Sequence, residues 1–166
     1  IKEEEQVTEE LELDPISAYN KTKMVSERVL LSYQDAMGIQ VVRPVTVCAY
    51  SPRMRVDVSV NMLAMQALTT GQIKVFGGKQ IRPNIHIDDI TDVYLFLLNR
   101  PDVTGIYNAG FENISILDIA SLITQYLPAD IKVTESNDPR SYRVNSDKLL
   151  AKGFQPKKKV KDAIEE

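Results

Sequence analysis

Short apolar segments alternate with helical patterns along this chain. Residues 39–43 and 73–76 are runs rich in β-branched side chains between turn residues, which is typical of buried strands. A helix that leads directly into such a strand indicates a parallel α/β sheet. The predicted strands are 39–43, 73–76, 81–87, 105–110 and 131–134, and the predicted helices are 15–37, 58–70, 90–99, 116–126 and 147–151.

The helix predicted at 15–37 has the clearest boundary signals. Asp14 suits the cap position before a helix, Pro15 suits the first helical position, and Gly38 suits the end. The later helices follow other polar residues that suit a cap. These are Asp57, Asp88 with Asp89, Ser115 with Asp118 three positions on, and Ser146. The acidic segment 1–13 is expected to be an exposed loop.

The segment 44–54 is expected to be irregular, because Pro44, Ser51 and Pro52 interrupt it. In parallel sheets, ligands bind just past the carboxyl ends of the strands. A ligand is therefore expected at the loop 45–55. The glycine pair 77–78 has neither the spacing of a dinucleotide fingerprint nor a phosphate-binding lysine, and no glycine-rich fingerprint occurs elsewhere in the sequence.

Composition narrows the function classes. The 166 residues carry a net charge of -3, so no polyanion-binding signature is present and no nucleic-acid partner is expected. No apolar run approaches the roughly 18 residues that a membrane span needs, so no membrane partner is expected either. The single cysteine, Cys48, excludes an internal disulfide. Because the sequence also contains only one histidine, His86, no metal site is expected. A reducing cytoplasm is the expected location.

Tyr19 and Lys23 are the candidate catalytic residues. They lie four positions apart in a predicted helix, so both side chains project from one face. A free phenol is almost entirely protonated at neutral pH, and a fixed ammonium nearby favours the phenolate, which can then act as a base. A Tyr-x-x-x-Lys match arises easily by chance in a chain of this length, so the pair needs support from other segments.

Several motifs in order supply that support. They run from Val7-Thr8-Glu9 to Tyr19-x-x-x-Lys23, then Arg43-Pro44-Val45-Thr46-Val47 and Pro52-Arg53, Val75-Phe76-Gly77-Gly78, His86-Ile87-Asp88-Asp89, Tyr107-Asn108-Ala109-Gly110, and Arg140 with Asp147-Lys148. With this order and spacing, the chain resembles the extended short-chain dehydrogenase/reductase family, and within it the nucleotide-sugar epimerases and dehydratases.

The resemblance implies a role for each matching residue. Tyr19 would be the acid/base during hydride transfer between a sugar carbon and NAD, and Lys23 would also hold the ribose hydroxyls of NAD. Asn61 is expected to contact the substrate, a nucleotide-diphosphate sugar. Arg82 and Arg140 are expected to clamp its diphosphate, because a guanidinium fork matches phosphate oxygens. The nicotinamide is expected to lie against Pro44, Val45, Thr46 and Val47, with Thr46 also touching the substrate.

The resemblance also implies a fold and its division. The chain would be the carboxyl-terminal part of a Rossmann-type parallel sheet plus a small α/β substrate-binding lobe. Residues 1–54, with 84–110 returning to them, would complete the NAD-binding domain, and 55–83 and 111–166 would form most of the lobe. A homodimer through the helix 15–37 is expected as well.

Departures from the family pattern set alternatives. The glycine-rich turn of the family's first half is not in this sequence, and the catalytic Ser or Thr of relatives would precede Val7, so Ser17 is not taken for it. Relatives often carry Asn in the nicotinamide loop, where this chain has Thr46. They often carry Gly before the Pro-Arg pair, where this chain has Ala49-Tyr50-Ser51. Epimerase and dehydratase stay open, as do an NADP-dependent keto-sugar or carbonyl reductase and a truncated, non-catalytic fragment that binds nucleotide sugars.

Overall fold

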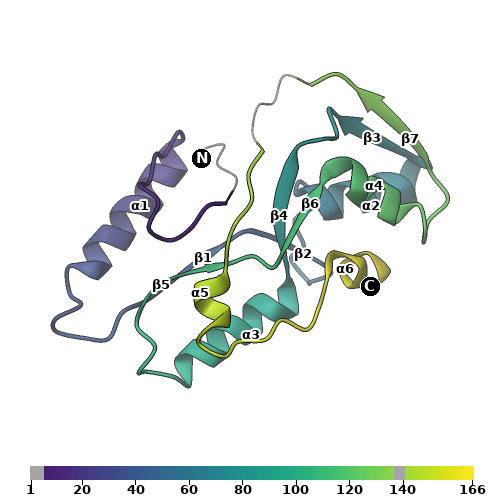
Figure 1. The fold of residues 1–166 in the computed structure, drawn as a ribbon. Helices are drawn as coiled ribbons and strands as arrows, with labels where there is room; N and C mark the ends of the chain where they lie inside the picture. Colours follow the sequence, from purple (N-terminus) through teal and green to yellow (C-terminus); the bar gives the residue numbers. More distant parts are fainter. Residues whose placement is uncertain (1–5, 137–140) are drawn as a thin grey trace.

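The computed structural model describes residues 6–136 and 141–166 and confirms an α/β chain. Figure 1 shows α1 at one end of the molecule and α2, α4, β3 and β7 at the other. The helices are α1 (Ala18–Leu31), α2 (Ser59–Thr70), α3 (Ile87–Leu98), α4 (Ile116–Ile123), α5 (Asp147–Leu150) and α6 (Val160–Glu165). The strands are β1 (Gln40–Pro44), β2 (Thr46–Cys48), β3 (Gln72–Phe76), β4 (Ile81–His86), β5 (Gly105–Ala109), β6 (Glu112–Ser115) and β7 (Asp130–Thr134).

The strands form three small sheets, and most pairs are parallel. β1 pairs with β5 and β3 pairs with β7, each in parallel, while β2, β4 and β6 form a sheet in which only the β4–β6 pair is antiparallel. The parallel arrangement confirms the prediction from the apolar pattern. β2 and β6 were not predicted: β2 lies within the segment 44–54, which was expected to be irregular, and β6 has only four residues.

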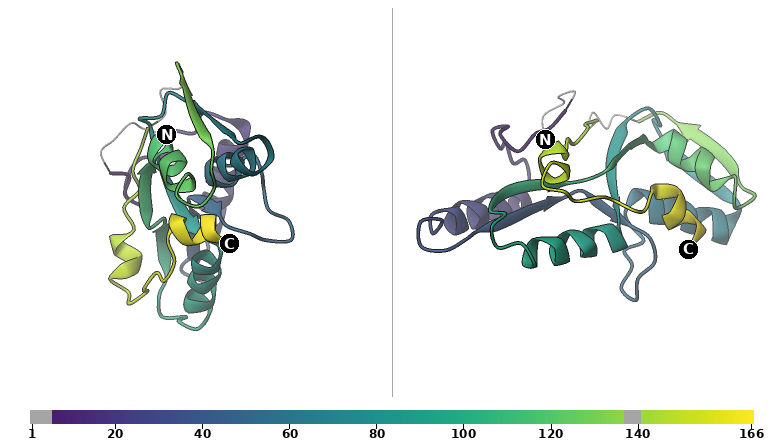
Figure 2. Two further views of the ribbon diagram at one scale, coloured as in Figure 1. Left: turned by 90° about the vertical axis from the view of Figure 1, so that its right-hand side faces the viewer. Right: turned by 60° about the horizontal axis from the view of Figure 1, so that its bottom comes forward.

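The molecule is elongated (Figure 2), and its buried apolar residues form two separate clusters. The first is built mainly by α2, β3, α4 and α6, and includes Leu63, Ile73, Ile119 and Val160. The second is built mainly by α3 and β5, and includes Val93, Tyr107, Leu149 and Phe154. The division into lobes at the predicted boundaries stays a proposal. Leu149 and Phe154, which that division gives to the substrate lobe, pack in the other cluster.

The first helix is shorter than predicted. It begins after Ser17, whose hydroxyl accepts a hydrogen bond from the Asn20 amide at 3.1 Å, so Asp14 and Pro15 lie outside it. It ends at Leu31, and turns lead on to Gly38. Ser17, and not Asp14, caps the helix because its hydroxyl accepts a hydrogen bond from an amide of the first turn. In the described part of the chain, no helix is both long and apolar enough to cross a membrane.

Two further predicted caps are wrong. Helix α2 is preceded by Val58, and the Asp57 carboxylate instead binds the Arg55 guanidinium at 2.6 Å. Helix α3 is capped by His86, whose Nδ1 accepts a hydrogen bond from the Asp88 amide at 3.1 Å. An imidazole nitrogen can replace a carboxylate at a cap because it also offers an acceptor lone pair. The cap predicted at Ser115 is confirmed.

Ser146 precedes α5 as predicted, but its hydroxyl does not cap that helix. It bonds the backbone of Gly110 instead, donating to the carbonyl at 2.9 Å and accepting from the amide at 3.0 Å. Among the amino-terminal acids, Glu9 is buried rather than exposed, and its carboxylate accepts from the Asn108 amide at 2.7 Å. Both side chains thus tie distant backbone to the end of β5.

Candidate active site

Helix α1 presents Tyr19 and Lys23 together on an exposed face. The Lys23 ammonium lies 5.4 Å from the centroid of the Tyr19 ring, as the helical spacing predicts. The tyrosine is 69% exposed, so a ligand can reach its hydroxyl. A phenol and an ammonium stacked at the surface form an arrangement that can exchange a proton with a bound hydroxyl compound.

The loop between β2 and α2 is fastened by one buried side chain. The Asn61 amide oxygen accepts a hydrogen bond from the Ala49 backbone N–H at 3.2 Å, and its nitrogen donates to the Arg55 carbonyl at 2.9 Å. Ala49 has a φ of 91°, a region that favours glycine. Asn61, which was predicted to contact the substrate, therefore joins Ala49 to Arg55 within the loop where a ligand was expected.

Arg55 is a candidate site residue that the sequence did not single out. Its guanidinium binds Asp57 through two bonds of 2.9 and 2.6 Å. Hydrogen bonding to Asp57, together with the charge of that carboxylate, raises the pKa of Arg55. The same pair lowers the pKa of Asp57. The loop thus presents an exposed cation, and the position of Arg55 shortly after the end of β2 was the available signal.

The predicted nicotinamide loop continues the sheet. Pro44 ends β1 opposite Ala109, and the Val45 amide donates to the Ala109 carbonyl at 3.1 Å. A Cβ at Gly110 would come within 2.6 Å of the Val45 side chain, so this approach requires glycine. Thr46 and Val47 then pair with β4, Thr46 opposite Asn84 and Val47 opposite Ile85.

Of the two arginines predicted to bind the diphosphate, Arg82 lies within the described residues. Arg82 lies on β4 opposite Ile114 of β6, and its guanidinium donates to the Ile81 carbonyl at 3.2 Å. Arg140 lies outside the described residues. Asn61 and Arg82 are thus placed on different elements from the Tyr19–Lys23 pair.

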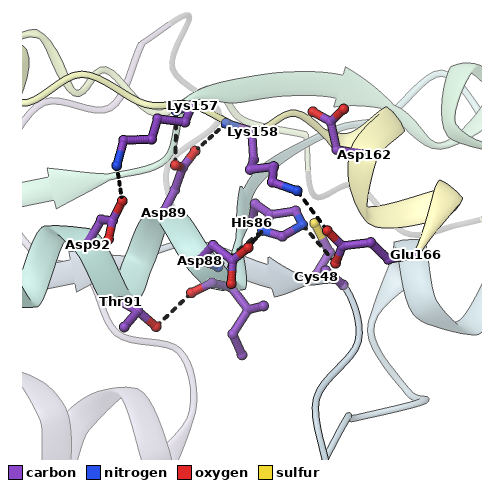
Figure 3. Close-up of polar contacts among 12 residues, drawn as sticks. Cys48, His86, Asp88, Asp89, Thr91, Asp92, Lys157, Lys158, Asp162 and Glu166 are labelled. Carbon is purple, nitrogen blue, oxygen red and sulfur yellow. Dashed lines mark hydrogen bonds and ion pairs between the residues drawn. The ribbon is translucent and has the colours of Figure 1, made fainter.

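A second cluster of polar groups lies where β4 meets α3 (Figure 3). The side chain of His86 is fully buried there, and Asp89 is only 1% exposed. The Asp89 carboxylate accepts from the backbone amides of Lys157 and Lys158 at 2.9 and 3.1 Å. This cluster, formed by His86, Asp88, Asp89, Lys158 and Glu166, is called the junction below.

The junction also contains the group of described residues that could supply metal ligands, namely His86, Asp88 and Glu166. The His86 Nδ1 already accepts from the Asp88 amide, so a neutral ring carries its proton on Nε2, which lies 3.4 Å from a Glu166 oxygen. The Lys158 ammonium binds Glu166 at 2.8 Å and lowers its pKa. With both lone pair and carboxylate engaged, this geometry does not favour a cation.

The described residues fit only part of a dinucleotide site. Lys23 can donate to ribose hydroxyls, since an ammonium has three donors, and Tyr19 stands beside it at the surface. A pyrophosphate is usually held by a glycine-rich turn before a helix, and the sequence has no such fingerprint. The residues fit the nicotinamide riboside end of NAD better than its phosphates.

Curated relatives are longer than this chain. An uncharacterized UDP-glucose epimerase of Bacillus subtilis (strain 168) is 32% identical over 120 residues, which cover 70% of this chain and 38% of that protein. A UDP-glucose 4-epimerase of Lactobacillus helveticus is 25% identical over 184 residues, covering 95% of this chain and 56% of that protein. The chain thus spans about 38–56% of the length of these two relatives.

Solved structures agree with these relatives. The UDP-glucuronic acid 4-epimerase from Bacillus cereus, in complex with UDP-glucuronic acid and NAD, superposes with a TM-score of 0.82 at 27% identity, over 99% of this chain and 55% of that one. Residues 1–110 match the NAD dependent epimerase/dehydratase family, a match that covers well over half of the sequence. The chain therefore belongs to the NAD dependent epimerase/dehydratase family.

Proposed function

We propose that this chain supplies the acid/base and part of the substrate site of an NAD-dependent nucleotide-sugar epimerase or dehydratase. The observation that carries the proposal is the exposed Tyr19–Lys23 pair on α1, with the ammonium 5.4 Å from the ring centroid. Membership of the family and the likeness to epimerases that hold NAD support it.

In the proposed reaction, Tyr19 moves the proton and Lys23 supports it. The Tyr19 phenolate oxygen takes the proton from a sugar hydroxyl and later returns it, while the Lys23 ammonium attracts the negative charge on the ring oxygen. Lys23 also donates to the ribose hydroxyls of the cofactor. NAD, when bound, supplies the acceptor for the hydride of the sugar carbon.

The proposed substrate is a nucleotide-diphosphate sugar. Arg82 and Arg140 would bind the diphosphate through guanidinium–phosphate hydrogen bonds, with Thr46 and Asn61 contacting the substrate closer to the reacting sugar. Arg55 adds an exposed cation in the loop where the ligand is expected. UDP-glucuronic acid is bound by the Bacillus cereus epimerase and is the first substrate to test.

Replacing Tyr19 by Phe tests the proposal in the full-length enzyme. Turnover of the nucleotide sugar should fall by about 10²–10⁴-fold, the usual contribution of a general base, while binding of NAD is retained. Tyr33→Phe is the matched control, because Tyr33 is also exposed and follows the same helix. Near-normal turnover in Tyr19→Phe would overturn the assignment of the base.

A second candidate, binding without turnover, is favoured by one observation: the sequence contains no glycine-rich dinucleotide fingerprint. In that case the chain would bind UDP or a UDP-sugar but not NAD. Calorimetric titration of the chain with UDP and with NAD separates the cases. Tight NAD binding by this chain would contradict the view that its pyrophosphate site is missing.

We also propose a homodimer through α1. The helix exposes several apolar side chains, and exposed apolar groups that gather on one element favour association. They are Val25, Val29 and Leu30, with Tyr33 just beyond the helix. Sedimentation should show a dimer that Val29→Lys weakens, and a monomer at all concentrations would exclude it. The cytoplasmic location stays a prediction.

A further inference from the structure

Helix α1 touches the rest of the chain along one narrow stripe. Its half-buried residues are Asn20, Met24, Glu27 and Leu31, which recur at helical spacing and so share one face. None of the helix residues is fully buried. Apolar burial alone therefore holds this helix only loosely, and a specific contact is needed to fix its rotation about its axis.

Glu27 makes that contact with Arg43 of β1. Two hydrogen bonds join the groups, from Arg43 Nη2 to Glu27 Oε1 at 2.6 Å and from Nε to Oε2 at 2.9 Å. The Glu27 side chain is only 11% exposed and the Arg43 side chain 20%, so solvent screens the pair little. A planar guanidinium that binds both carboxylate oxygens fixes orientation as well as distance.

Arg43 is itself fixed on a second side. Its Nη1 donates to the Glu9 carbonyl at 3.1 Å, and the Glu9 carboxylate accepts from the Asn108 amide of β5 at 2.7 Å. Arg43 and Asn108 also lie opposite each other in the β1–β5 pair. The guanidinium thus joins α1 to a rigid unit of two strands and the segment around Glu9.

Glu27 stands in line with the candidate catalytic pair. Positions 19, 23 and 27 follow each other at intervals of four, so they lie on neighbouring parts of one helix face, with Tyr19 about 12 Å along the axis from Glu27. A rotation of α1 that broke the contact with Arg43 would swing Tyr19 and Lys23 by the same angle.

From this geometry we infer that Glu27 and Arg43 are positioning residues, which aim the Tyr19 hydroxyl and the Lys23 ammonium at the reacting sugar. The inference rests on the proposed function. A purely stabilising role explains the pair less well, because a buried ion pair contributes little net stability relative to apolar packing. A displacement of about 1 Å in a catalytic group can lower a rate by about 10²-fold, so such a device matters for turnover.

The test compares Glu27→Ala and Arg43→Lys with wild type in the full-length enzyme. We expect kcat to fall by about 10–100-fold with both variants, while the KM values for the nucleotide sugar and for NAD change less than about threefold. Arg43→Lys keeps the positive charge and loses only the fork, so it remains informative should Glu27→Ala fold poorly. Asp102→Ala is the matched control, since Asp102 makes the same two-bond contact with exposed Arg100.

Combining Glu27→Ala with Tyr19→Phe identifies which proposal fails. If the pair acts through Tyr19, Glu27→Ala should lower kcat in the wild-type background and leave the residual rate of Tyr19→Phe unchanged. Wild-type turnover in Tyr19→Phe would overturn the proposed function. A large loss in Tyr19→Phe with normal kcat in Glu27→Ala and Arg43→Lys, or with losses that multiply in the double variant, would overturn the positioning role alone.

Discussion

Tyr19 and Lys23 on α1, called the α1 pair below, and the junction both place ionisable side chains close together, but they differ in exposure and in hydrogen-bond partners. At α1, Tyr19 is 69% exposed, and the contact that it makes within the described chain is with Lys23. At the junction, His86 and Asp89 are buried, and Asp89 holds two backbone amides. The junction contains the residue types of many catalytic sites, yet His86 Nδ1 and Asp89 accept from backbone amides of the fold, and among the described residues the buried His86 Nε2 has no hydrogen-bond partner.

If Tyr19 and Lys23 form the proposed active site, then exposure and hydrogen-bond partners, rather than residue types, distinguish it from the structural junction. A carboxylate that is almost fully buried and accepts two amide hydrogen bonds is out of reach of a substrate. An exposed phenol beside an ammonium has its hydroxyl available. We therefore expect substitutions at the junction to change stability, and substitutions at α1 to change turnover.

The largest expected effect concerns Cys48, which lies beside the junction in Figure 3. Burial, reinforced by the Glu112 charge, raises the pKa of the Cys48 thiol from 9.0 to about 12. At pH 8 the folded thiol should therefore be about 10³-fold less ionised than an exposed one, and correspondingly slow to react with a thiol reagent. Reaction in native buffer as fast as in urea would contradict this.

The same shift has a defined sign for stability. Between about pH 9 and pH 12 the unfolded thiol is ionised and the folded thiol is not, so unfolding releases a proton and the free energy of unfolding falls as pH rises. Below pH 9 the thiol is protonated in both the folded and the unfolded chain, so Cys48 causes no loss of stability there. Urea titrations across this range should show a shallower decline for Cys48→Ala than for wild type.

Asp89→Ala should destabilise the fold by about 2–5 kcal/mol, because it removes a buried carboxylate that accepts from the partly buried amides of Lys157 and Lys158. Asp92→Ala is the control on the same helix. Asp92 binds the largely exposed Lys157 ammonium at 2.7 Å, so its loss should cost less than about 1 kcal/mol. The urea midpoint measures both, and equal losses would show that the Asp89 contacts are not special.

The sequence predicted the larger features of this fold well. Apart from β2, β6 and α6, the order of helices and strands follows from local periodicity, as do the parallel α/β class and the shared face of Tyr19 and Lys23. The cap at Ser115 follows from an equally local pattern. These features depend on residues within a few positions of one another.

Features set by distant contacts could not be predicted. Glu9 is buried because it meets the Asn108 amide, 99 positions away, and Asp89 is committed to amides 68 and 69 positions away. The Ser146 hydroxyl binds the backbone of Gly110, 36 positions away, instead of capping α5. In each case composition indicated a solvated charge or a helix cap, and tertiary packing decided otherwise.

Gly110→Ala should destabilise the fold by about 1–3 kcal/mol, because the new Cβ would lie 2.6 Å from the Val45 side chain. A β-branched valine cannot easily move aside. Val45→Ala should recover part of the loss in the double variant, since it removes both methyl groups that the new Cβ would meet. Additive losses in the two variants would show that the contact at the predicted nicotinamide loop is not the cause.

The smallest expected effect lies in the loop between β2 and α2. Within residues 6–136 and 141–166, Ala49 is the one non-glycine residue with a positive φ, at 91°, and it directly follows Cys48, which pairs with His86 of the junction. Ala49→Gly should raise the free energy of unfolding by about 0.5–1 kcal/mol, because relief of about 1–2 kcal/mol of strain exceeds the added entropy of the unfolded chain.

Gly71→Ala is the opposite control for this prediction. Gly71 ends α2 with a φ of 64°, and a Cβ there would meet no atom within 4 Å, so strain without a clash should lower the free energy of unfolding by about 1 kcal/mol. Both changes are measured by urea unfolding. If Ala49→Gly left the midpoint unchanged or lowered it, the backbone at Ala49 would not be strained, and the Asn61 contacts alone would hold this loop.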